Sequence, residues 1–105
     1  MADTCVSAQG SVATGTAATI FTASGTGTGT IVGEIRFKNT NSSSVVVTVY
    51  RNGTSSGNAM APFTIPANGY AAYENERWAL QINETIAALS ASTGVTYFVS
   101  GDQLS

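Results

Sequence analysis

The stretch that decides the fold is TIVGEIRFKNTNSSSVVVTVY, residues 30–50. Its first part, Thr30–Asn39, alternates between two sets of side chains, which is the period of a half-buried β-strand and not of a helix. Successive side chains of a strand point to opposite faces, so we expect one set in the core and the other in water. The expected core set is Ile31, Gly33, Ile35 and Phe37, and the expected solvent set is Val32, Glu34, Arg36 and Lys38.

The second part, Ser44–Tyr50, is apolar on both faces, because Val45, Val47 and Val49 point one way and Val46, Thr48 and Tyr50 point the other. A strand of this kind is typically covered twice, so we expect a second sheet or a neighbouring subunit on its outer face. The residues between the two strands, Asn39–Ser43, are turn-forming, and the sequence therefore predicts an antiparallel hairpin.

Shorter runs of the same kind recur along the rest of the chain, separated by Gly, Asn, Ser and Pro. They are residues 17–23, 61–65, 70–73, 78–82, 85–89 and 95–100. With the two strands above, they make about eight short strands at the spacing typical of a sandwich or jelly roll. We predict an all-β fold, a single antiparallel β-sandwich or jelly-roll-like domain; residues 84–90 could also form a helical turn.

The N-terminal segment differs from the rest of the chain because it contains few apolar residues and many Ser, Thr and Gly residues. We expect residues 1–16 to form a flexible arm rather than a strand, and residues 17–105 to form the β-sandwich domain. Inside that domain, the Gly-Thr-Ser run at residues 24–29 is expected to be the most mobile loop.

The composition excludes several classes of function. Charged residues make up 10% of the 105 residues, where about 25% is usual, and the net charge is -2, which disfavours nucleic-acid binding. There is no His and only one Cys, so we expect no metal, no cofactor and no disulfide within the chain. No apolar run approaches the roughly 20 residues that span a membrane, and we expect a soluble protein made in the cytoplasm.

Few residues are candidates for chemistry. Glu74 and Glu76 have the spacing of paired carboxylates on one face of a strand, but Tyr73–Arg77 also reads as an ordinary solvated loop. We expect that the chain is not an enzyme. Tyr50 and Tyr73, next to charged or turn residues, are the aromatic side chains best suited to an interface, and with Val46 they form the predicted protein-interface set.

The order of these segments resembles that of small β-sandwich virion proteins of tailed bacteriophages. The resemblance covers nearly the whole chain and rests on five segments: AATIFTA at 17–23, IVGEI leading to Asn39-Thr40 at 31–40, VVVTV at 45–49, IPANG at 65–69 and VSG at 99–101. Such proteins decorate or cement capsids, or belong to the neck and tail. No binding residue is carried over from the resemblance.

The resemblance implies a virion structural protein, most simply a capsid decoration (cement) protein that binds the outside of the assembled head. Its expected partners are the major capsid protein of the same phage and further copies of itself, with a trimer as the first guess because shells offer three-fold positions. We expect the arm and an apolar patch with Val46 and Tyr50 to make the contacts. The alternatives are a neck- or tail-associated protein and a host-glycan-binding tip module, in which Trp78 and two tyrosines would share one exposed face.

Overall fold

The computed structural model describes residues 4–60 and 62–104, and the side chains of all of these except residues 73–77. Over this part of the chain there are eight β-strands and one 3-10 turn, Ser56–Asn58, and no helix long and apolar enough to cross a membrane. The strands are β1 (Thr4–Ser11), β2 (Ala18–Thr22), β3 (Gly29–Asn39), β4 (Val45–Arg51), β5 (Phe63–Ile65), β6 (Tyr70–Leu80), β7 (Thr85–Ser90) and β8 (Val95–Leu104). The predicted all-β fold is confirmed.

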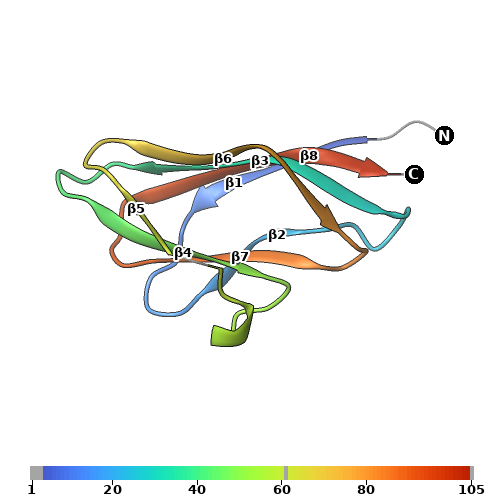
Figure 1. Ribbon diagram of the computed structural model, residues 1–105, viewed down its shortest axis with the longest axis horizontal. Coiled ribbons are helices and arrows are strands. Elements are labelled where there is room, and N and C mark those ends of the chain that lie inside the picture. Colours follow the sequence, from blue (N-terminus) through green and yellow to red (C-terminus); the bar gives the residue numbers. More distant parts are fainter. Residues whose placement is uncertain (1–3, 61, 105) are drawn as a thin grey trace.

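The strands form two four-stranded antiparallel sheets that lie face to face, one above the other in Figure 1. Sheet A has the order β1-β8-β3-β6 and sheet B the order β2-β7-β4-β5. The pairs β1–β8, β2–β7, β3–β6 and β4–β5 are nested one inside the next along the chain. This nesting makes the sandwich an eight-stranded jelly roll.

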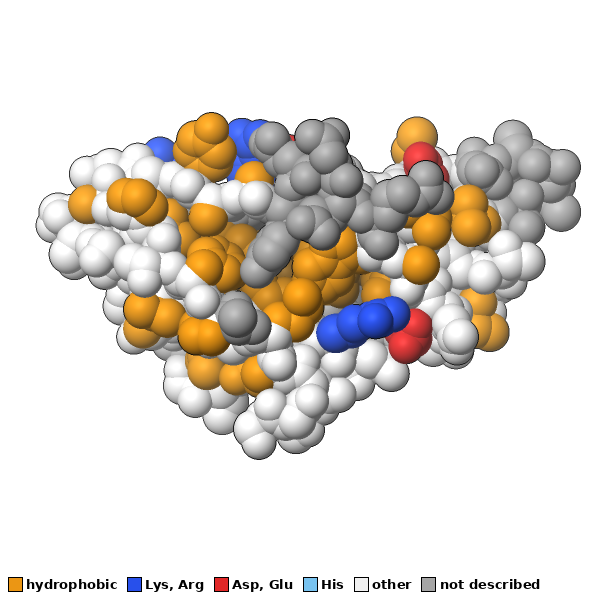
Figure 2. Space-filling model, in the orientation of Figure 1, with side chains coloured by type: hydrophobic (Ala, Val, Ile, Leu, Met, Phe, Trp, Pro, Cys, Tyr) orange, Lys and Arg blue, Asp and Glu red, His pale blue; other side chains and the backbone are white. Residues whose placement is uncertain are grey.

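The core lies between the two sheets and consists almost entirely of aliphatic side chains, with Phe37 as the largest fully buried one. Figure 2, in the same orientation as Figure 1, shows hydrophobic side chains gathered between the two layers. Phe37 of sheet A contacts Phe63 of sheet B, with ring centroids 5.6 Å apart and an angle of 49° between the rings. The other large hydrophobic side chains that are fully buried are Val32, Ile35, Val47, Val49, Ile65, Ile86, Val95 and Val99. Each sheet thus contributes every second side chain of its strands to the core, as an alternation of period two predicts.

A β-bulge in β3 corrects part of the predicted alternation. The register with β8 shifts between Val32 and Glu34, because Gly33 is an extra residue in β3. One extra residue exchanges the two faces, so Val32 is fully buried and Ile31 is only half-buried, the reverse of the prediction. Beyond the bulge the prediction is right, since Ile35 and Phe37 are buried.

The predicted hairpin between β3 and β4 is wrong, because β3 belongs to sheet A and β4 to sheet B. The chain crosses between the sheets directly after Asn39, whose side chain is 0% exposed. Its Nδ2 donates to the carbonyl oxygens of Ser43, Ile65 and Pro66 at 2.9, 3.2 and 3.1 Å, and its Oδ1 accepts from the backbone N–H of Asn41 at 2.9 Å. The polar segment therefore forms an arch fixed by the β5–β6 turn instead of a tight turn between paired strands.

The N-terminal residues were expected to form an arm, but Thr4–Ser11 form β1, which pairs with β8 over its whole length. Val6 and Ala8 pack against the core, and this short apolar stripe is sufficient because β8 supplies the remaining order through main-chain hydrogen bonds. Residues 1–3 of the predicted arm lie outside the described residues.

One further strand prediction is wrong. Residues 70–73 and 78–82 were expected to form two strands around a loop, but the backbone from Tyr70 to Leu80 is one strand, β6. The strand predicted at residues 85–89 is confirmed as β7, and the alternative helical turn does not form there. Ala61, where one predicted strand began, lies outside the described residues, and β5 begins at Phe63.

Candidate functional site: two contrasting sheet faces

The outer face of sheet B contains two of the three predicted interface residues. Val45, Val47 and Val49 point inward, so Val46, Thr48 and Tyr50 of β4 point outward. Residues directly opposite in an antiparallel pair share a face, which adds Thr64 of β5 beside Val46 and Leu89 of β7 beside Thr48. We call these five residues the β4 face.

The β4 face is apolar for a solvated sheet. Val46 is 44% exposed, and Tyr50 and Leu89 are half-buried. None of the five residues is charged, whereas the outer face of an antiparallel sheet in water is ordinarily polar. Ala87 of β7 lies opposite Tyr50 and is 0% exposed, so the chain itself covers part of this side of sheet B. Val46 is the most exposed apolar side chain that remains on the β4 face.

The structure does not place the third predicted residue on this surface. Tyr73 belongs to β6 in sheet A, where its backbone pairs with that of Ile35, and its side chain is outside what the structure describes. Val46 and Tyr50 thus share a face because they are an even number of residues apart in one strand. Tyr73 is not part of the β4 face.

The outer face of sheet A is different because it carries charged side chains. Arg36 donates to Glu34 at 3.1 Å, and its guanidinium carbon lies 5.0 Å from the centre of the Tyr70 ring. Lys38 donates from Nζ to the carbonyl oxygen of Asn68 at 2.9 Å. The ion pair is partly exposed, so it contributes less than about 1 kcal/mol to the free energy of unfolding.

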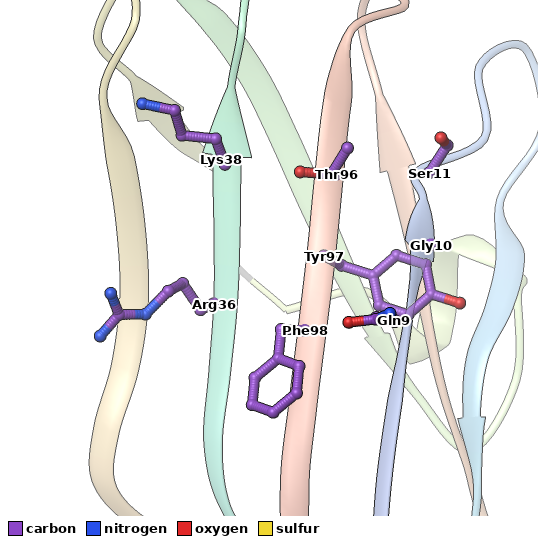
Figure 3. Close-up of a pocket in the computed structure, with 8 residues that line it drawn as sticks. All are labelled: Gln9, Gly10, Ser11, Arg36, Lys38, Thr96, Tyr97 and Phe98. Carbon is purple, nitrogen blue, oxygen red and sulfur yellow. The ribbon is translucent and has the colours of Figure 1, made fainter.

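A shallow groove of about 500 Å³ crosses this charged face between β3, β8 and β1. Its central feature is Phe98, which is 37% exposed and was not among the predicted interface residues. The signal that could have found it is the alternation in β8, where Val95 and Val99 point inward and Phe98 outward. In Figure 3, Arg36 and Lys38 lean towards β6 and away from Phe98, so the cations do not converge on the aromatic ring.

The described residues contain no group of three or more His, Cys, Asp or Glu that could hold a metal ion. The side chains of Glu74 and Glu76 lie outside the described residues, so the carboxylate pair stays a sequence hypothesis. Cys5 is an exposed free thiol on β1.

Comparison with known proteins shows the fold. No family model matches the chain, and no curated protein does. Among solved structures, the chain is similar to one in Bacillus endospore appendages described as disulfide-linked pili, with a TM-score of 0.59 and 19% identity over 99% of this chain and 88% of that one. It is also similar to a chain of the cyanophage Pam1 capsid asymmetric unit, with a TM-score of 0.52 and 14% identity over 98% of this chain and 85% of that one.

Proposed function

We propose that this chain is a structural protein of a bacteriophage virion that decorates the assembled head and binds its outer surface through non-covalent contacts of the β4 face. The partner would be the major capsid protein, and the protein would stabilise the shell by binding the assembled state many times over. The proposal assigns no catalytic step to the chain.

The observation that carries the proposal is the uncharged outer face of sheet B. The centres of protein interfaces are depleted of charged residues and enriched in aromatic ones, and this face combines Val46, Leu89 and Tyr50 without a charge. The opposite face, with Glu34, Arg36 and Lys38, has the character of a surface that stays in water. The two faces together suit a module that rests on a shell with one side and is solvated on the other.

The comparisons are compatible with this proposal. The jelly roll is a common fold of viral capsid proteins. The likeness to the cyanophage capsid chain covers nearly all of both chains, so the matched capsid component is itself a small protein of about this size.

Binding to shells that lack the chain tests the contact surface. Val46→Asp adds a charge at the most exposed apolar residue of the β4 face, where desolvation of a carboxylate on binding is costly, and we expect affinity for the shell to fall about a hundredfold. The control is Thr96→Asp, which adds the same charge at an exposed position on sheet A. Co-sedimentation measures both, and undiminished binding of Val46→Asp would contradict the assigned surface.

Electron microscopy of the intact particle tests the location. We expect repeated density for the sandwich on the outside of the head, with sheet B towards the shell. Density at the neck, or at a tail tip that binds host glycans, would support the alternatives and contradict decoration. A filament subunit is a second candidate, favoured by the likeness to the appendage chain, and ordered fibres of the purified protein would support it.

A further inference from the structure

The free edge of sheet A is formed by a strand with no protection against pairing. β1 lies at the end of its sheet, and its eight residues, TCVSAQGS, include no charged residue and no Pro. Its register with β8 is unbroken from Thr4 to Ser11, so no bulge turns the edge away. Such an edge is a template for another strand.

The other three edges each carry a protective feature. β5 has only three residues, with Pro62 and Pro66 on its two sides. β2 has five residues and a register shift between Thr19 and Phe21. β6 includes Glu74, Glu76 and Arg77 in its sequence. Short length, Pro, bulges and charges are the means by which proteins prevent edge pairing, and only β1 among the described edges has none of them.

The direction of the unpaired main-chain groups follows from one hydrogen bond. Just beyond β1, the N–H of Val12 donates to the oxygen of Val95 at 2.8 Å, and the pair continues the β1–β8 register. Hydrogen-bonded and non-bonded positions alternate along an antiparallel pair, so the even-numbered residues of β1 bond to β8. The main-chain groups of Cys5, Ser7, Gln9 and Ser11 therefore point away from β8 to the open side.

We propose that β1 pairs antiparallel with β1 of a second copy of this chain, joining two A sheets into one continuous eight-stranded sheet. Among its described strands, a second copy offers one unprotected edge, and that edge is β1 again. The contact is therefore the same patch on both copies and closes as a two-fold dimer. Because β1 is uncharged, the pairing brings no like charges together.

The register that uses all four outward residues places Ser7 opposite Gln9 and Cys5 opposite Ser11 of the second copy, with the two-fold axis at Ala8. The axis of such an edge pairing is perpendicular to the sheet, so both β4 faces would point to the same side. This pairing stands on the edge of sheet A alone and is independent of the proposed function.

The test is the mass of the protein in solution, measured by light scattering with Cys5→Ser to exclude disulfide dimers. Ser7→Pro removes one outward N–H per copy without touching a β1–β8 hydrogen bond, and Pro is tolerated at such edge positions. We expect the parent to be a dimer and Ser7→Pro to weaken association roughly tenfold to a hundredfold, whereas the control Ser7→Ala, which keeps the N–H, leaves it unchanged.

A second measurement fixes the register and does not depend on how Ser7→Pro folds. In the Cys5→Ser background, a mixture of Ser7→Cys and Gln9→Cys chains should form a disulfide between copies on mild oxidation, and either variant alone should not. A monomeric or trimeric parent, a folded Ser7→Pro dimer of unchanged affinity, or a mixture that fails to cross-link would each overturn the proposal.

Discussion

Replacement of Asn39 by Ala is expected to be one of the most destabilising single changes in this protein that leaves the hydrophobic core intact. The amide group donates to three carbonyl oxygens and accepts one backbone N–H, and its side chain is 0% exposed. Each lost hydrogen bond costs about 1 kcal/mol, and a group left buried without a partner costs about 1–3 kcal/mol. We therefore expect the free energy of unfolding to fall by about 3–5 kcal/mol, a large part of the 5–15 kcal/mol typical of a domain.

The assay is urea unfolding followed by the fluorescence of Trp78, the only Trp in the chain. The matched control is Asn41→Ala in the same arch, which removes an exposed hydrogen bond of 2.7 Å to the carbonyl oxygen of Thr93 and should cost about 1 kcal/mol. Asn39→Asp should be as destabilising as Asn39→Ala, since its oxygens would face the carbonyls of Ile65 and Pro66. Equal midpoints for the Asn39→Ala and Asn41→Ala variants would refute the argument that Asn39 holds the arch.

Two further predictions concern stability and use the same unfolding assay. Thr30 is 1% exposed and its Oγ1 has no hydrogen-bond partner among the described residues, so Thr30→Val should raise the free energy of unfolding by about 1 kcal/mol; a loss of that size would indicate a partner for the hydroxyl. Gly101→Ala should destabilise by about 2–4 kcal/mol because its Cβ would overlap the carbonyl oxygen of Ile31 beside the bulge. Gly33→Ala, where the added Cβ meets nothing within 4 Å, should change stability by less than about 0.5 kcal/mol, and equal effects at the two glycines would contradict the packing at the bulge.

The strands of this fold were predictable where apolar residues alternate, and their partners were not. The valines of β4 predicted both the strand and its inward face, because a period of two is a local property. The arch after Asn39 has the same turn-forming composition as a hairpin loop. The segment forms an arch and not a hairpin because Asn39 donates to the carbonyl oxygens of Ile65 and Pro66, which lie 26 and 27 residues further along the chain.

The sequence predictions for β1 and β3 were wrong because the local alternation of apolar residues does not determine either strand. β1 needs only Val6 and Ala8 to cover the core, and the rest of its order comes from β8 at the other end of the chain. In β3, one extra residue, Gly33, forms a bulge that exchanges the two faces, and periodicity alone does not locate such an insertion.

The candidate surface was predictable to the extent that it lies on one strand. Val46 and Tyr50 are four residues apart in β4 and share a face for that reason. Tyr73 was grouped with them on chemical character, and only the sheet order separates it from them. Phe98 was missed because aromatic residues in a small domain are ordinarily core, although the alternation of β8 turns it outward.

The first and last described strands are antiparallel neighbours, with Thr4 opposite Gln103. The start of β1 and the end of β8 therefore lie side by side at one end of the molecule, as Figure 1 shows. The longest dimension of the molecule is 46 Å. A short linker could join these two strand ends, and the chain could be reopened in a loop at the opposite end, giving a circular permutant with the same two sheets. A peptide or enzyme fused to either terminus would lie at the same end of the molecule. The jelly roll could therefore serve as a scaffold that displays both fusions on one side.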